Sequence, residues 1–125
     1  MYDNIKLDTG RTRPTRPISW VQSARRAFER WPDDVKKSCW NALTVAAEGG
    51  KADTAKPMTG LGPGVLEIAI KHRKNAFRVV YALRIGEVIW VVHAFQKKST
   101  QGIKTPRREI ELIEARIKAL EGQPE

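Results

Sequence analysis

The middle of the chain carries a concentration of basic side chains that could bind phosphate groups. Residues 71–108 contain ten lysines and arginines and one acidic residue, a net charge of +9, which equals the formal net charge of the whole protein. Arg78 interrupts one apolar run, and the pair Lys97-Lys98 ends another. Folding this segment into neighbouring strands would concentrate positive potential, which favours binding to nucleic acid or to an acidic protein. The alternative is a generally basic surface without a specific partner.

Basic side chains are sufficient for one reaction, the cleavage of RNA without a metal ion. They can bind the scissile phosphate, hold the 2′-hydroxyl in line and stabilise the charge that develops on the phosphate oxygens. The 2′-hydroxyl is the nucleophile, so DNA would be spared. No metal site or cofactor is predicted, because the chain has one cysteine and two histidines, and Gly60–Gly64 lacks the Lys-Ser/Thr of a phosphate-binding loop.

Three apolar runs with strand character must position these side chains. They cover Val65–Ile70, Phe77–Leu83 and Val88–Phe95. The connections between them are short enough for hairpins, which predicts an antiparallel meander.

Arg78 lies on one face of the second run together with small residues, whereas the bulky residues lie on the face expected to meet helices. An unpaired arginine is costly to bury. Two interpretations follow: Arg78 pairs with an acid such as Glu67 or Glu87, or it binds an anion at the floor of a shallow cleft.

The end of the third run carries two adjacent lysines after a histidine. Alternation places His93 on one side with Val91, Phe95 and Lys97, and Lys98 on the other. At most one of the two lysines therefore lines a given cleft. His93 is either a hydrogen-bonded core histidine or a general acid or base, since histidine titrates near neutrality.

Two further basic clusters flank these runs. Lys71, Arg73 and Lys74 form a basic turn, and Arg107-Arg108 opens the last predicted helix. Charged residues in such positions are often only solvated surface. Together with Arg78 and the lysine pair they could instead form an electrostatic track for an RNA backbone.

Two helices are predicted before the three strands in the sequence, and one after them. Ser23 caps a helix over Ser23–Arg30, and a second helix opens at Pro32 or Asp33 and ends at Gly49-Gly50. The two form a helical hairpin in the simplest arrangement. A third helix begins at Thr105-Pro106, with Thr105 as its cap. Arg16–Val21 is a plausible edge strand, and Lys51–Gly64 is predicted to be a loop.

The chain as a whole predicts one α+β domain in a reducing compartment. We expect a flexible arm over residues 1–15 and a single domain over residues 16–121. No apolar run approaches the roughly 20 residues of a membrane span, and the first residues do not resemble a signal peptide. The single cysteine, Cys39, lies on an apolar helical stripe and is predicted to be a packed thiol. These features favour a cytoplasmic protein.

Four short motifs in order resemble the RelE/ParE toxin superfamily, specifically the phage-derived Gp49-like group that includes HigB toxins. They are GVLEI at residues 64–68, FRVVY at 77–81, HAFQKKS at 93–99, and Thr105-Pro106 at the start of the last helix. The similarity covers Val65–Leu120, and the helical N-terminal half and Ala55–Met58 also fit it. The implied fold is RelE-like: an N-terminal helical hairpin packed on a small antiparallel sheet of three to four strands, with a C-terminal helix.

The resemblance implies the toxin of a type II toxin–antitoxin pair. Such HigB-like proteins are metal-independent endoribonucleases (mRNA interferases), often acting on mRNA at the ribosome. A helix-turn-helix (HigA-like) antitoxin silences them, and operator DNA is bound only through that complex. The family's basic site residues map onto Arg78, Lys97 and Lys98, with His93 as a further candidate for proton transfer.

The sequence departs from the family at one place. RelE-type nucleases carry two basic residues, two positions apart, where this chain has Glu67 and Ala69. Lys71 and Arg73 could substitute for them. Two other functions therefore stay open: a ParE-like inhibitor of DNA gyrase, or a catalytically inactive antitoxin-binding module.

Overall fold

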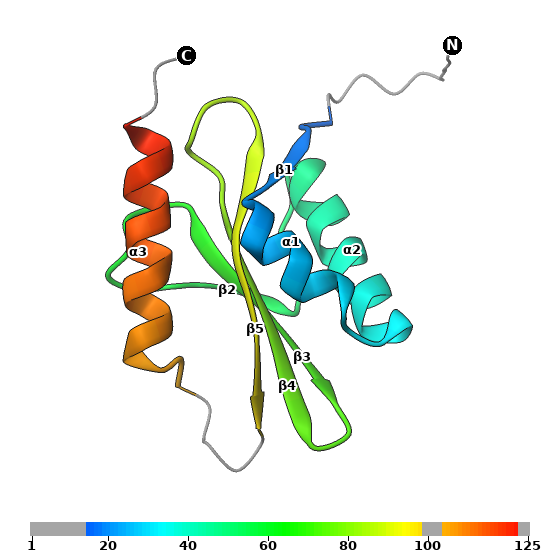
Figure 1. The fold of residues 1–125 in the computed structure, drawn as a ribbon. Helices are drawn as coiled ribbons and strands as arrows, with labels where there is room; N and C mark the ends of the chain where they lie inside the picture. The colour runs from blue at the N-terminus through cyan, green and yellow to red at the C-terminus, as the bar shows by residue number, and fades with distance from the viewer. Residues whose placement is uncertain (1–14, 99–103, 123–125) are drawn as a thin grey trace, which may run out of the picture.

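A five-stranded sheet separates helices α1 and α2 from helix α3 (Figure 1). The computed structural model describes residues 15–98 and 104–122. Its elements are, in chain order, β1 (Ile18–Trp20), α1 (Gln22–Glu29), α2 (Asp33–Ala47), β2 (Ala55–Pro57), β3 (Val65–His72), β4 (Asn75–Ala82), β5 (Ile89–Lys98) and α3 (Arg107–Glu121). The strand order is β1-β5-β4-β3-β2; β1 runs parallel to β5, and the other neighbours are antiparallel.

The larger core lies between the sheet and helices α1 and α2. The helical stripe predicted on α2 is buried, including Val35, Cys39 and Leu43, and it packs against sheet residues such as Ile68 and Val79. Burial raises the pKa of the Cys39 thiol to about 12. Cys39 is therefore a packed, unreactive thiol, as the sequence predicts.

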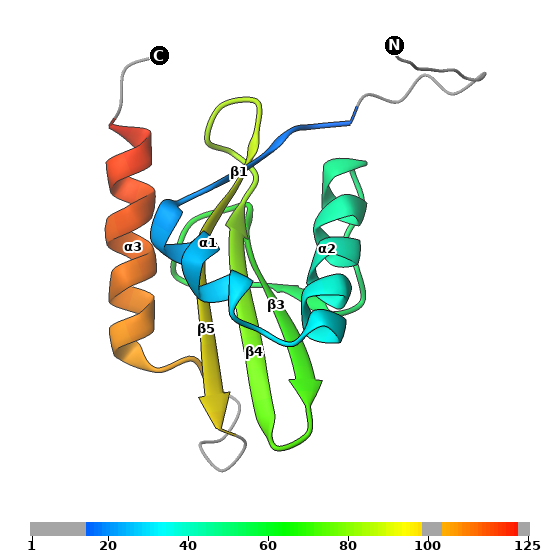
Figure 2. The same ribbon diagram turned by 45° about the vertical axis from the view of Figure 1, so that its right-hand side comes forward.

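A smaller core lies on the opposite face, under α3. Ile113 and Ile117 of α3 are buried against Val80 of β4 and Val92 of β5. The helical spacing of the apolar residues in α3 is thus explained by a single contact face on the sheet. Figure 2 shows α3 on the other side of the sheet from α1 and α2.

The sheet is larger than the predicted three to four antiparallel strands. The edge strand β1 pairs in parallel with β5, and β2 forms within Lys51–Gly64, which had no strand signal. The β2 strand is only three residues long and ends in Pro57, which an edge strand tolerates because one of its sides forms no sheet hydrogen bonds. Short edge strands are the elements that propensity identifies least well.

Two predicted helix caps are wrong. The N-cap of α1 is Val21 rather than Ser23, and the N-cap of α3 is Pro106 rather than Thr105; neither makes a side-chain capping bond. The Thr105 hydroxyl donates instead to the carboxylate of Glu67 on β3. The C-terminal prediction for α2 is confirmed, since the chain turns after the helix at Gly49 with a φ of 94°.

Two sequence predictions fall partly or wholly outside the described residues. The flexible arm was predicted over residues 1–15, of which the structure describes only Thr15. The single domain over residues 16–121 stays a prediction. None of the helices within residues 15–98 and 104–122 has the length and apolar content needed to span a lipid bilayer.

A β-bulge in β5 decides which side chains reach the α3 face. Val80 pairs with His93, whereas the next residue of β4, Tyr81, pairs with Val91, so Val92 is the extra residue. Val91 consequently packs with the larger core and Val92 with the smaller one. The prediction that Val91 shares a side with His93 is therefore wrong, because plain alternation cannot include a bulge.

Tyr81 provides a test of the larger core. Its side chain is fully buried, and its hydroxyl has no hydrogen-bond partner among the described residues. Because an unsatisfied buried hydroxyl costs about 1–3 kcal/mol, we expect Tyr81→Phe to leave the free energy of unfolding unchanged or to raise it by about 1 kcal/mol. Urea unfolding measures this; a loss of more than about 1 kcal/mol would show that the hydroxyl has a partner.

Candidate functional site

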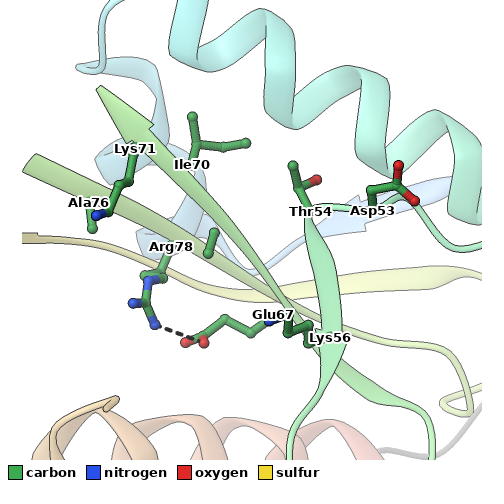
Figure 3. A pocket seen from close by; sticks show the side chains of 9 residues that line it. Asp53, Thr54, Lys56, Glu67, Ile70, Lys71, Ala76 and Arg78 are labelled. Atoms are coloured by element: carbon green, nitrogen blue, oxygen red, sulfur yellow. Dashed lines mark hydrogen bonds and ion pairs between the residues drawn. The ribbon is translucent and has the colours of Figure 1, made fainter. Parts of the chain in front are cut away.

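A pocket of about 500 Å³ opens at the outer part of the sheet, beside β2, β3 and β4. This volume lies in the range of about 300–1,000 Å³ that is usual for ligand sites. Charged and small residues line it together: Asp53, Thr54, Lys56, Glu67, Ala69, Ile70, Lys71, Ala76 and Arg78 (Figure 3). The pocket therefore combines cations, two carboxylates and the open space that small side chains leave.

Arg78 forms the floor of this pocket from the middle of β4. It is 8% exposed, and its Nη1 donates a hydrogen bond of 2.9 Å to Oε1 of Glu67. Figure 3 shows both side chains extending from the sheet toward α3. The other carboxylate oxygen, Oε2, accepts a bond of 2.8 Å from the Thr105 hydroxyl. Arg78 therefore pairs with an acid, as the first sequence interpretation states, and it also lines a cleft; that it binds an anion there stays a prediction.

Strand register places three side chains of β3 in a row along the pocket. Glu67, Ala69 and Lys71 alternate onto the face that carries Arg78, and Ala69 lies directly opposite Arg78. Arg78 therefore lies between a carboxylate on one side and an ammonium group on the other. Ala69 and Arg78 both line the pocket.

Lys97 is the lysine of the pair that lies on the face of Arg78. It pairs with Ala76, is 5% exposed, and its Nζ donates to the carbonyl of Lys104. Desolvation and the nearby guanidinium of Arg78 lower the pKa of Lys97, while the Glu67 carboxylate opposes that shift. Strand register therefore places Lys97 beside Arg78 on the same face of the sheet, although Lys97 is not among the residues that line the pocket. Lys98 ends β5 opposite Asn75, and its side chain lies outside what the structure describes.

His93 lies deeper under α3 and is not among the residues that line the pocket. Its Nε2 is 2.6 Å from Oε1 of Glu109, and its Nδ1 is 2.9 Å from Nη1 of Arg116, which also donates to the carbonyl of Val92. Because arginine can only donate, Nδ1 is the acceptor and Nε2 carries the proton that it donates to Glu109. Burial is the main reason that the pKa of His93 is lowered, which favours this neutral form.

The remaining predicted site residues lie on the outer surface. Lys71, Arg73, Lys74, Arg107 and Arg108 are all exposed. The β3–β4 turn, the end of β5 and the first turn of α3 lie toward the same lower end of the molecule in Figures 1 and 2. The fold therefore gathers cations that are distant in sequence at one end of the sheet, next to the pocket.

Arg73 has a left-handed backbone conformation, which is unfavourable for residues other than glycine. Its φ is 59° in the two-residue turn between β3 and β4, where glycine would adopt this left-handed region without steric cost. We expect Arg73→Gly to raise the free energy of unfolding by up to about 1 kcal/mol and to weaken RNA binding by several-fold through the lost charge. Urea unfolding and filter binding measure both effects, with Lys74→Gly as a control that removes the same charge. A less stable Arg73→Gly variant would contradict the strain argument.

Sequence reasoning missed several residues that shape the pocket. The sequence places Lys56 in a predicted loop and Thr105 at a predicted helix cap, and it identifies Glu67 as a partner for Arg78 and as a departure from the RelE-type basic pair, but not as part of a pocket. Lys56 joins the pocket because β2 pairs with β3 opposite Glu67. In the part of the chain that the structure describes, no group of three or more His, Cys, Asp or Glu side chains is placed to hold a metal ion.

Comparison with known proteins identifies the fold. Residues 26–118 match the family described as phage derived protein Gp49-like (DUF891). Two solved structures of the E. coli toxin RelE, a mutant in the free state and the isolated toxin, superpose with TM-scores of 0.54 and 0.50 at 16% and 17% identity. They cover 84% and 80% of this chain and 97% of each RelE chain. Comparison with curated proteins found no match. The predicted RelE-like α+β fold is confirmed.

Proposed function

Because the chain belongs to the phage-derived Gp49-like family and has the fold of RelE, we propose that it is the toxin of a type II toxin–antitoxin system. We further propose that it is a metal-independent endoribonuclease, an mRNA interferase of the HigB type. One observation supports the enzymatic part of this proposal. Arg78 lines a pocket together with Glu67 and Lys71, which could accept and donate protons, and Lys97 lies beside it on the neighbouring strand.

The proposed reaction uses the substrate's own nucleophile. The Arg78 guanidinium binds the two non-bridging oxygens of the scissile phosphate, and Lys97 adds positive potential from the neighbouring strand. The 2′-hydroxyl attacks the phosphorus and expels the 5′-oxygen, which leaves a 2′,3′-cyclic phosphate and a free 5′-hydroxyl. A rigid sheet holds the charged groups before the substrate arrives, so little reorganisation is required.

The exposed cations hold the RNA on either side of the pocket. Lys71, Arg73 and Lys74 lie at the turn of one hairpin, and Arg107 and Arg108 start α3. Such contacts to phosphates are not sequence-specific, and they weaken steeply as salt rises. Affinity for RNA should therefore depend strongly on ionic strength.

The partners follow from the family resemblance. We propose that the protein acts in the cytoplasm on mRNA, bound to the ribosome, and that a helix-turn-helix (HigA-like) antitoxin neutralises it. Operator DNA would be bound only through the complex with that antitoxin.

Purified protein added to translating ribosomes tests this function. We expect new mRNA 5′ ends at defined positions, bearing free hydroxyls, in the presence of EDTA, and no cleavage of DNA of the same sequence. Uncut mRNA together with arrested supercoiling would support a ParE-like inhibitor of DNA gyrase. No effect in either assay, with tight antitoxin binding, would indicate a binding module in which Glu67 neutralises Arg78.

A further inference from the structure

Glu67 is held in the pocket by contacts from two different elements. Arg78 of β4 donates to one carboxylate oxygen at 2.9 Å, and Thr105, just before α3, donates to the other at 2.8 Å. The Glu67 side chain is 14% exposed, so it is shielded while still lining the pocket. A carboxylate fixed in this way has a defined orientation, and each oxygen keeps a lone pair that can accept a further proton.

Glu67, Ala69 and Lys71 are spaced along one face of β3 in a way that suits an in-line displacement at phosphorus. Glu67 and Lys71 are four residues apart on one strand face, a span of about 13 Å between their Cα atoms at 3.3 Å per residue. Ala69 lies midway between them, opposite Arg78. A phosphate seated on Arg78 above Ala69 would have the carboxylate on one side and the ammonium on the other. The attacking and leaving oxygens of the phosphate also lie on opposite sides of the phosphorus.

The other groups near the site are less suited to accept the 2′-hydroxyl proton. Both ring nitrogens of His93 already form hydrogen bonds to Glu109 and Arg116. Asp53, the other carboxylate of the pocket, is exposed at its rim, whereas the Glu67 side chain is shielded and held in a fixed orientation. An exposed ammonium such as that of Lys71 has no lone pair and can only donate.

We propose that Glu67 is the general base of the cleavage reaction, an inference that rests on the proposed endoribonuclease function. A Glu67 carboxylate oxygen takes the proton of the 2′-hydroxyl while the bond from O2′ to phosphorus forms. The bond from phosphorus to O5′ breaks, and O5′ takes a proton from the ammonium of Lys71. Proton exchange with water then restores the carboxylate and the ammonium. The glutamate at a position where RelE-type nucleases have a basic residue thus replaces, rather than abolishes, acid–base catalysis.

Single-turnover cleavage on translating ribosomes tests this assignment with Glu67→Gln. Glutamine preserves the size and an acceptor for Arg78 but cannot take the proton, so we expect the cleavage rate to fall by about 10²–10⁴-fold. Binding of an RNA with a 2′-O-methyl group at the cleavage site should change by less than about threefold.

Matched variants separate catalysis from structure. Glu114→Gln makes the same charge change on an exposed residue of α3 and should cleave like the wild type. Glu67→Asp should recover part of the rate, because it restores the carboxylate at a less favourable distance. If the wild type cuts RNA and Glu67→Gln cuts it within about threefold, the general-base assignment is overturned while the proposed function stands. An inactive wild type would overturn both.

Discussion

Arg78→Ala is expected to abolish toxicity and to lower the RNA cleavage rate by at least about 10²–10³-fold. Removing a preorganised donor to a developing anionic charge has effects of this size. The variant should still fold, but with a lower free energy of unfolding, because it loses the hydrogen bond from Arg78 to the shielded Glu67 carboxylate. Single-turnover cleavage on ribosomes measures the rate, and circular dichroism with urea unfolding measures the fold.

Two control variants show whether the effect of Arg78→Ala is specific to the guanidinium at this position. Arg78→Lys keeps the charge but loses the planar, two-pronged donor, so it should recover only a small part of the activity. Arg26→Ala removes the same charge from an exposed position on α1, on the far side of the sheet, and should remain toxic. Full toxicity of a folded Arg78→Ala variant would remove Arg78 from the site.

His93→Ala is expected to lower the free energy of unfolding by about 2–4 kcal/mol. The substitution removes the link between Glu109 and Arg116 and leaves their charges without their shared partner under α3. His72→Ala is the matched control: His72 is 3.5 Å from the exposed carboxylate of Asp34, so its loss should cost less than about 1 kcal/mol. Equal losses for the two histidines would contradict the anchoring role.

The same contacts give stability a defined pH dependence. Burial lowers the pKa of His93 in the folded protein below its value in the unfolded chain. The contribution of His93 to the free energy of unfolding is therefore present above about pH 6.5, and it is lost as the pH falls through the folded-state pKa of His93. Urea unfolding between pH 7 and pH 5 should show falling stability for the wild type and a flatter profile for His93→Gln. The groups that face His93 are Glu109, which opposes the shift, and Arg116, which reinforces it.

Kinetics distinguish the two interpretations of His93. The sequence allowed a core histidine or a general acid or base, and the hydrogen bonds to both ring nitrogens favour the core role. At a temperature where His93→Ala is fully folded, a cleavage loss above about a hundredfold would assign the residue to proton transfer instead.

The spacing of apolar residues in the sequence was sufficient to predict the helices and strands that bury one regular face. The stripe on α2 and the apolar face of α3 could be predicted because each helix buries one face against the sheet. The meander of β3, β4 and β5 followed from apolar runs joined by short turns. Strand β1 lies within the predicted Arg16–Val21, but β2 was not predicted. Three residues carry too little pattern to identify a strand, and pairing with a longer neighbour stabilises it.

The sequence by itself determined the chemistry available to this protein: a cationic segment, an arginine on a strand face of small residues, and at most one lysine of the pair beside it. Only the tertiary structure decided which groups meet. Strand register put Lys97 on the face of Arg78 and placed Ala69 opposite the guanidinium. The packing of α3 brought Thr105 to Glu67, 38 positions away in the chain. Local patterns specify the face on which a side chain lies, whereas contacts between distant segments depend on how whole elements pack.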